Sequence, residues 1–559
     1  MRKLMMTVGL SAVCAFAAMA LYACHAEDDD PAGQAGELQD PVRRQNAVTN
    51  IHRLYTTALA NHTGDRNHPA VKAIADVTVE QLAQTYIDHP EDTQNGSSII
   101  NLFSEMRDRR SIPALLKALN WRSEVTEEHA IAASRTLKVM DLPDDTKAQV
   151  ITGLSDALDK ITGARAVDNR MRIEFIRALG AIGDRRATPI LTKIALAQRE
   201  EQNFLINRLA ATSLGELGDP EAVQPMIECL FLFAPGNPAM RMNDVAAESL
   251  VRIGRPALEP LLQVLRGQNA EVNAIAQQYI EAVRVRDERA ARDMNVRALT
   301  SAEATFALGA LGFREALAPI QEEMANEDVG RKINAAIAIV RLNLEPAERV
   351  RVRDSLKAVY EAAPLAAKAQ LLAAMRHMYD ADLLPFFLEQ ARDSDLHPQV
   401  REQAVIAYAF LSNRAESAAL RTMIQAEPAS EDGGFRENFA LNDPSLSAAQ
   451  ECDTNIQCWI GKLSDADNMV VKKASYMLGR YGRANDEAIT ALVEKLDHDD
   501  LEVRLAVVGA LDFIAVAGSQ AALDKIERLR ETEEGRSIWT NFAREALPVQ
   551  ARLRTRMQG

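Results

Sequence analysis

The cysteine pair Cys452 and Cys458 is the first place in this sequence where side chains could do chemistry. Two cysteines six residues apart can be joined across a turn, and nearby cysteines tend to pair in an oxidising compartment. A zinc site would instead require a two-residue spacing and a companion histidine, and neither is present around this pair. A metal pair is the alternative, and the sequence favours a local disulfide that fixes this loop.

The other cysteine and histidine candidates indicate structure more than catalysis. Cys229 lies in an apolar helical stretch, which predicts a buried thiol. His62 and His68 are the closest histidine pair, and their polar surroundings fit a solvated loop better than a metal site. His129 follows two glutamates at the expected start of a helix and has no catalytic context.

The sequence shows no catalytic motif. It has no phosphate-binding glycine loop, no nucleophile elbow, no His-Glu-x-x-His helix and no paired-carboxylate motif. We therefore expect no catalytic residue, no cofactor and no metal, in a protein that is not an enzyme. The formal net charge of −15 repels nucleic acid phosphates and anionic lipid headgroups, so we expect no nucleic acid partner.

The N-terminus predicts export. Arg2 and Lys3 precede an apolar run from Leu4 to Tyr22, the pattern of a signal peptide over residues 1–23. An uncleaved anchor helix is the alternative, although the run is short for a membrane span. Residues 24–40 are acidic and contain glycine and proline, which predicts a flexible tether.

The segment Leu21-Tyr22-Ala23-Cys24 resembles a bacterial lipoprotein signal, although Tyr22 is bulkier than the small residue usual at that position. The resemblance implies a diacylglyceryl group on Cys24 and a lipid anchor as the protein's contact with the membrane. It also implies a place in the bacterial cell envelope, at the outer membrane or the periplasmic face, with exposure at the cell surface left open. Ordinary signal-peptidase cleavage after Ala26 is the alternative.

The body of the chain repeats a helix-ending pattern. Apolar helical stretches close on glycines, of which the first three are 35 and 36 residues apart. These glycines are Gly183, Gly218, Gly254, Gly312 and Gly482. Asp184 and Asp219 follow two of them and can cap the next turn. A proline then marks a new helix start, at Pro189, Pro225, Pro260 and Pro319. The repeating unit is therefore two antiparallel helices, and neighbouring pairs must stack to bury their apolar faces.

Three arginines recur near helix starts in different repeats. They are Arg172, Arg401 and Arg504. We expect them to donate hydrogen bonds to the neighbouring repeat and stiffen the array. The alternative is that they line a concave ligand groove.

With these motifs the body resembles the HEAT-repeat family, specifically the short HEAT-like type also found in phycobilisome lyases. The resemblance covers residues 95–530 and implies an all-α solenoid of roughly ten to thirteen helix pairs. Residues 125–165 and 345–395 lose the Gly-Asp-Pro pattern but keep helical periodicity. Residues 41–94 are expected to form a helical N-terminal cap, and residues 531–559 C-terminal capping helices. Insertions at about 231–244 and 427–450 are expected to be surface loops, with a binding face as the alternative.

The resemblance implies a non-catalytic scaffold that binds a protein or peptide partner through its concave surface. A structural subunit of an envelope complex is the first alternative. A chromophore lyase-like enzyme or small-molecule binder is the second. That alternative requires aromatic and polar side chains to converge in one groove, whereas the aromatic residues, 5% of the chain, are spread evenly along it.

Overall fold

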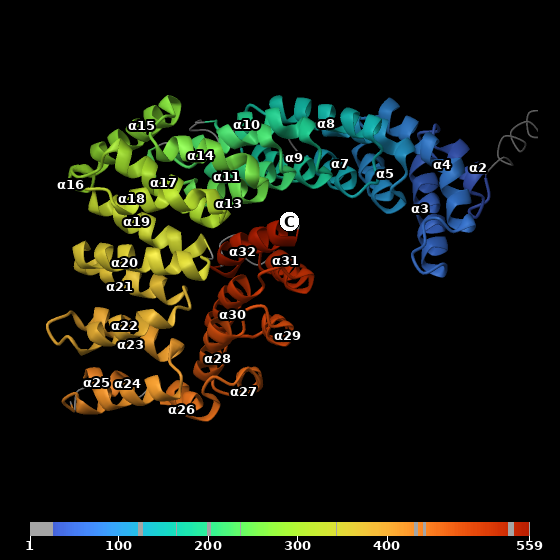
Figure 1. The fold of residues 1–559 in the computed structure, drawn as a ribbon. Helices are drawn as coiled ribbons and strands as arrows, with labels where there is room; N and C mark the ends of the chain where they lie inside the picture. The colour runs from blue at the N-terminus through green and yellow to red at the C-terminus, as the bar shows by residue number, and fades with distance from the viewer. Residues whose placement is uncertain are drawn as a thin grey trace, which may run out of the picture. The chain divides into compact units, whose positions relative to one another are not determined.

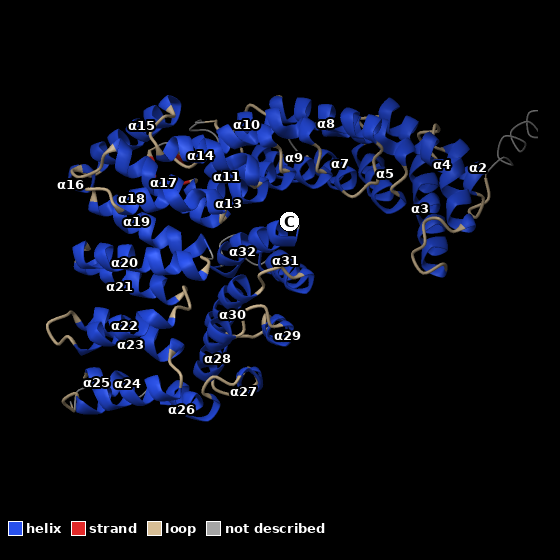
Figure 2. Cartoon of the chain, viewed as in Figure 1, coloured by secondary structure: helices blue, strands red, loops and turns tan. Residues whose placement is uncertain are grey.

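The structure is a computed structural model that describes residues 26–120, 127–163, 165–197, 203–234, 236–342, 344–429, 434–439, 443–534 and 541–557. The chain forms two compact units, Met1–Ser213 and Leu214–Gly559. Helices dominate both (Figures 1 and 2). The predicted all-α solenoid of stacked helix pairs is confirmed.

The first unit is an open stack of helices in two rows. In one row α3, α5, α7 and α9 pack in sequence, and in the other α4, α6 and α8 do so. The helices are α2 (Pro31–Glu37), α3 (Arg44–Asn61), α4 (Pro69–Asp88), α5 (Thr93–Met106), α6 (Ile112–Leu119), α7 (Glu128–Lys138), α8 (Asp144–Asp159), α9 (Ala166–Ile182) and α10 (Thr188–Ala195); α11 (Phe204–Leu217) spans the boundary between the units.

The corner between paired helices has one recurring geometry. Gly183 ends α9 in a left-handed conformation with φ +70°. This conformation costs glycine little energy because glycine has no Cβ. The Asp184 carboxylate then accepts the N–H of Arg186 and starts a 3₁₀ turn that leads into α10. Pro189 lies in the first turn of α10, where its missing N–H has no intrahelical partner to lose.

Most of the other glycines and prolines take equivalent positions. Gly218, Gly254 and Gly312 have positive φ angles, and Asp219 accepts the N–H of Glu221. Pro225, Pro260 and Pro319 lie in the first turns of α12, α14 and α18. Gly482 differs, with φ −92°, and the left-handed residue of that corner is Ala484 instead.

The recurring arginines bond to the end of the preceding helix. Arg172 donates to the carbonyl of Ile161 at 2.7 Å, and Arg401 to that of Ala391 at 2.9 Å. Arg504 donates to the carbonyl of His498 at 2.8 Å. Each satisfies a carbonyl left open where the previous repeat ends, which ties neighbouring repeats together.

The expectation of a flexible tether is wrong for the described part of residues 24–40. Residues 31–37 form α2, which packs against α3 and α4. The Asp30 carboxylate caps the helix, and Leu38 is fully buried. The acidic composition gave no sign of this helix because only Ala35 and Leu38 supply its buried apolar contacts. Cys24 lies outside the described residues.

The second unit contains the remaining helices and one β-hairpin. The hairpin, β1 (Phe233–Ala234) and β2 (Asn237–Arg241), falls in the insertion predicted at about 231–244, so this insertion is ordered rather than an irregular loop. The helices are α12 (Val223–Cys229), α13 (Asn243–Ile253), α14 (Leu258–Leu265), α15 (Ala270–Arg286), α16 (Glu288–Ala291), α17 (Val296–Leu311), α18 (Leu317–Met324), α19 (Val329–Ile339), α20 (Pro346–Ala362), α21 (Leu365–Arg376), α22 (Leu384–Arg392), α23 (Pro398–Leu411), α24 (Arg414–Ala426), α25 (Phe435–Asn438), α26 (Asp443–Cys452), α27 (Ile456–Lys462), α28 (Asn468–Tyr481), α29 (Asp486–Lys495), α30 (Leu501–Ile514), α31 (Gln520–Glu534) and α32 (Asn541–Met557).

The inner helices of the second unit close into a ring. In order around the ring, α13, α17, α19, α21, α23, α28, α30 and α32 each pack against the next, and α32 also packs against α13 and α17 (Figure 1). The C-terminal segment was expected only to cap the end of the array. It instead joins the two ends of the second unit.

The closure depends on buried charges. The Arg552 guanidinium bonds to the Asp512 carboxylate at 2.7 Å and donates to the carbonyl of Ala310 at 2.9 Å. Arg530 reaches Glu248 on α13 at 3.3 Å. Burial by itself would raise the pKa of Asp512, but the charges and hydrogen bonds of Arg552 and Arg556 outweigh it and hold that pKa below its usual range.

Candidate functional site: a cavity inside the helical ring

The ring of the second unit encloses a cavity of about 940 Å³. Its walls come from α19, α21, α23, α28, α30 and α32, together with Asn438 and Phe439 at the end of α25. These two residues belong to the insertion at 427–450, so this insertion contributes to the cavity wall rather than only to a surface loop. The cavity volume lies at the upper end of the range for small-ligand sites.

One end of the cavity gathers aromatic and basic side chains, and we call it the aromatic end. Its residues come from the C-terminal halves of four inner helices and from the corner after α21, and they are Arg376, His377, Tyr379, Phe410, Tyr476 and Phe513. The rings of Phe410 and Tyr476 stack with centroids 5.1 Å apart, and those of Tyr379 and Phe513 lie 4.8 Å apart. The predicted even spread of aromatic residues along the sequence therefore becomes a cluster in three dimensions.

Tyr379 is held in an unusual position within this cluster. It has φ +52°, in the left-handed region that disfavours residues with a Cβ. Its side chain is buried, and its hydroxyl has no hydrogen-bond partner. The ring fits because Gly479 lies against it without a side chain. A buried, unpaired hydroxyl on a strained backbone is the kind of feature that collects at functional sites.

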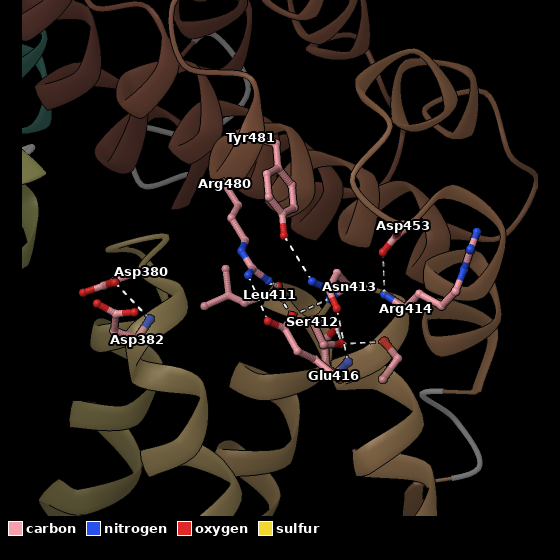
Figure 3. Close-up of polar contacts among 12 residues, drawn as sticks. Asp380, Asp382, Leu411, Ser412, Asn413, Arg414, Glu416, Asp453, Arg480 and Tyr481 are labelled. Carbon is pink, nitrogen blue, oxygen red and sulfur yellow. Dashed lines mark hydrogen bonds and ion pairs between the residues drawn. The ribbon is translucent and has the colours of Figure 1, made fainter.

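The corner that carries Tyr379 follows the repeat geometry with tyrosine in place of glycine. Asp380 accepts the N–H of Asp382, just as Asp184 caps the corner after Gly183 (Figure 3). Pro385 follows Asp380 by the same five residues that separate Pro189 from Asp184. The expectation that residues 345–395 lose this pattern is therefore wrong at this corner, because only the glycine has been replaced.

His377 lies next to the Tyr379 hydroxyl. A Cβ at Gly509 would lie 3.1 Å from that hydroxyl and 3.6 Å from His377 Nδ1, so both atoms approach the bare Cα of Gly509. The ring wall surrounds His377, yet its side chain remains exposed to the space within the cavity. Enclosure lowers the pKa of His377, and the charges of Arg376 and Arg341 lower it further, which keeps the imidazole neutral at pH 7.

Arg376 supplies positive charge to the aromatic end. Its guanidinium lies 5.1 Å from the ring centroid of Tyr476 and 5.6 Å from that of Phe410. Its Nε–H is buried without an acceptor, and no ion pair with a described residue neutralises it. The flanking rings fix the plane of the guanidinium and keep water away from its faces.

The opposite end carries acidic groups from the N-terminal turns of the same helices, and we call it the acidic end. Glu402 precedes Phe410 by eight residues on α23, which separates the two by roughly 12 Å along the helix. Glu402 and Glu502 make no ion pair with any described residue, and Lys472 lies at the same end. The cavity therefore has an excess of negative charge at one end and an unpaired cation at the other.

A polar corner between α23 and α24 aligns the cavity wall. Arg480 of α28 bonds to Glu416 at 2.7 Å and to the carbonyl of Leu411, and Asn413 reaches the hydroxyl of Tyr481 (Figure 3). The fully buried Lys473 donates to the carbonyls of Ala409 and Ser412. Burial lowers the pKa of Lys473, and the Arg480 charge lowers it further.

The candidates identified from the sequence lie apart from this cavity. Cys452 at the end of α26 and Cys458 in α27 are joined by a disulfide. Cys229 is fully buried in α12. The rings of His62 and His68 stack 3.5 Å apart near the surface of the first unit. No group of three or more metal-binding side chains occurs within the described ranges.

His129 has a structural role that the sequence did not reveal. It is buried between α5 and α7, where its ring nitrogens bond to the hydroxyls of Tyr86 and Ser97, each at 2.9 Å. The predicted helix start is confirmed, because α7 begins at Glu128, and the sequence did not indicate that the His129 ring is buried and hydrogen-bonded there. Burial lowers the pKa of His129.

Comparisons with known proteins agree with the repeat architecture. Residues 171–196 and 207–231 match the family model described as PBS lyase HEAT-like repeat. The chain is an all-α solenoid of stacked helix pairs, and the family match lies within two of its repeats. No curated protein matches it.

Two solved structures align over most of this chain. The karyopherin Kap121p bound to the SUMO protease Ulp1p is 10% identical with a TM-score of 0.40, over 98% of this chain and 77% of that one. An engineered protein is 17% identical with a TM-score of 0.23, over 80% of this chain and 99% of that one. At these scores neither likeness carries an argument about function. In the described part of the chain, no helix is long and apolar enough to cross a membrane.

Proposed function

We propose that this protein is a non-catalytic scaffold that binds a protein or peptide partner inside the ring of its second unit. The observation that carries the proposal is the cavity of about 940 Å³, whose wall combines clustered aromatic rings with unpaired charges of both signs. Aromatic side chains and arginines dominate the energetics of protein recognition. A polypeptide can supply complementary apolar and charged groups in one chain.

The cellular setting belongs to the same proposal. The N-terminal pattern around Cys24 supports export and attachment to the bacterial envelope through a lipid. A tethered ring would then hold its partner close to the membrane surface. A structural subunit of an envelope complex would differ by co-purifying with its partner in fixed stoichiometry.

The test is a crosslinked pull-down of the membrane-extracted protein. Wild type is compared with a Glu402→Arg/Glu502→Arg double variant, which reverses the charge of the acidic end, and with Arg255→Gln, which changes an exposed arginine outside the cavity. We expect one partner to be recovered with wild type and Arg255→Gln and lost with the double variant. A partner recovered equally with all three proteins would place binding outside the cavity.

A Cys24→Ala variant tests the tether separately. If lipid attachment positions the ring for binding, this variant should leave the membrane fraction and lose its partner in intact cells. It should still bind the purified partner in solution. A variant that stays in the membrane would contradict lipid attachment at Cys24.

A small-molecule ligand is the second candidate. Convergence of aromatic and polar side chains in one pocket was the requirement for this alternative, and the aromatic end meets it. Native mass spectrometry of protein purified from its source distinguishes the two. A constant added mass of a few hundred daltons, lost on denaturation, would favour a small ligand over a peptide.

A further inference from the structure

The most informative residue for the identity of the ligand is Tyr379. The equivalent corners after Gly183 and Gly218 use glycine in the left-handed conformation, whereas this corner holds a tyrosine there at φ +52°. Arg107 and Ala484 also take positive φ angles at their corners, but of these three residues only Tyr379 places a side chain in the cavity wall. The substitution costs backbone energy, and the structure shows no internal hydrogen bond that offsets the cost. What it supplies is a hydroxyl in the wall of the cavity, buried and without a hydrogen-bond partner in this structure, which can donate to a group that displaces the side chains over it.

The groups around this hydroxyl fit an anion that has a planar pair of oxygens. Arg376, His377 and Tyr379 all surround the ring of Tyr476, with His377 and Tyr379 each 5.8 Å from it between ring centroids. The Arg376 guanidinium has donors in a fixed plane, and its Nε–H is buried and has no acceptor in this structure. A carboxylate is the group that accepts from such a fork and from a neighbouring hydroxyl at the same time.

The acidic end sets the second requirement. Glu402 lies roughly 12 Å along α23 from the aromatic end, a distance that an extended chain spans in about three to four residues. Glu402 and Glu502 favour a positive group at that distance from the anion. The cavity volume of about 940 Å³ accommodates a short extended segment and excludes a folded domain.

We propose that the cavity binds the carboxyl-terminal end of an extended peptide. The terminal carboxylate lies at Arg376 and Tyr379, and a lysine or arginine about three to four residues before it lies between Glu402 and Glu502. The inference rests on the proposed function, because it specifies which part of a protein partner enters the ring. It also gives the complex a direction, with the chain end innermost.

The test uses the full-length protein and two synthetic hexapeptide libraries that differ only at the chain end. One library has a free C-terminal carboxylate, and the other ends in an amide. Peptides retained by the protein are identified by mass spectrometry, and the affinities of retained sequences are measured by fluorescence anisotropy. We expect retention from the acid library, with lysine or arginine enriched three to four residues before the end. Amidation of a retained peptide should weaken its binding roughly ten- to hundredfold.

Three variants measure how much each proposed contact contributes to peptide binding. Tyr379→Phe keeps the ring packing and removes only the hydroxyl, so binding of the acid peptide should weaken roughly fivefold while binding of its amide changes less. Arg376→Gln should remove most of the preference for acid over amide. Arg255→Gln, the exposed control outside the cavity, should bind as wild type does.

Three results would overturn the inference. They are equal retention from both libraries, retention from neither, and a Tyr379→Phe variant whose preference for acid over amide matches that of wild type. The proposed function can stand even if this inference fails. If a partner is recovered in the pull-down and lost with the acidic-end double variant, while the libraries show no acid preference, the cavity still binds protein but through an internal segment.

Discussion

The two units use the same helix-pair repeat but hold their repeats together differently. In the first unit, several ion pairs between neighbouring repeats lie at the surface: Arg109 and Asp141 are 51% and 95% exposed, and Lys193 and Asp159 are 56% and 52% exposed. The pair of Arg44 and Asp92, next to the N-terminal helices, is more buried, at 6% and 24%. In the second unit, the pair of Arg552 and Asp512 is 8% and 14% exposed. Lys473 there is fully buried.

The difference follows from the closure of the ring. An open stack has only nearest-neighbour contacts, and exposed pairs between repeats contribute little to its stability. A ring must also satisfy one particular end-to-end arrangement. Buried charges suit that purpose because they cost much when misaligned and are satisfied in one geometry only. The second unit is therefore expected to be the less tolerant of substitution.

The largest predicted effect is at the closure. Arg552→Ala removes one guanidinium from the Asp512 carboxylate, which keeps its bond to Arg556, and removes a donor to the carbonyl of Ala310. We expect a loss of about 3 kcal/mol in the free energy of unfolding of the second unit, measured by urea denaturation. Arg255→Ala, in an exposed pair with Glu315, should cost less than about 1 kcal/mol. Equal losses in the free energy of unfolding would contradict the difference between the buried pair at the closure and the exposed pair.

The second prediction compares the stability cost of replacing the buried Lys473 with that of replacing the exposed Lys193. Lys473→Met keeps a similar volume but leaves the carbonyls of Ala409 and Ser412 without their donor, which should cost about 2 kcal/mol. Lys193→Met in the first unit removes a lysine from an exposed pair and should change stability by less than about 0.5 kcal/mol. Thermal unfolding of the two variants against wild type checks both values.

The third prediction uses one repeat position in both units. Gly183→Ala and Gly312→Ala each place a Cβ on a left-handed residue, at a cost of about 1 kcal/mol. At Gly312 the added Cβ also clashes with the side chain of Arg552, whereas at Gly183 its nearest neighbour is the carbonyl oxygen of Ala181 at 4.0 Å. Gly312→Ala should therefore destabilise by a further 1–2 kcal/mol or so, since a buried, bonded side chain must shift. Equal losses of stability for Gly183→Ala and Gly312→Ala would show that the Arg552 side chain is not held against Gly312.

The smallest effect is the pH dependence of the closure. Because the folded-state pKa of Asp512 is lowered, its contribution to stability is present above the unfolded-state pKa of about 3.9 and is lost as the pH falls through the folded value. The stability difference between wild type and Asp512→Asn should accordingly shrink between pH 5 and pH 3. Urea midpoints of both proteins across this interval provide the check, and a constant difference would contradict it.

The repeat was predictable from sequence because its signals are local. A glycine that ends a helix, an aspartate that caps the next turn and a proline at a helix start act within a few residues, as at Gly183, Asp184 and Pro189. Leu38 shows the limit of composition, since one buried leucine anchors a helix in an acidic stretch.

The candidate site was not predictable, because its parts are distant in sequence. Closure joins Arg552 to Ala310, and no local pattern marks such a pair. The corner at Tyr379 was missed in the sequence because a tyrosine stands there in place of the expected glycine. The five-residue spacing from Asp380 to Pro385 is the signal that could have found it.

Hydrogen–deuterium exchange of the full chain, wild type against Arg552→Ala, tests ring closure most directly. We predict that wild-type α32 is as protected as α30, and that Arg552→Ala increases exchange in α13 and at the C-terminal end of α17, more than 200 residues away in sequence. Exchange changes confined to α30, α31 and α32, with α32 fraying like a free end in wild type, would contradict the closed ring.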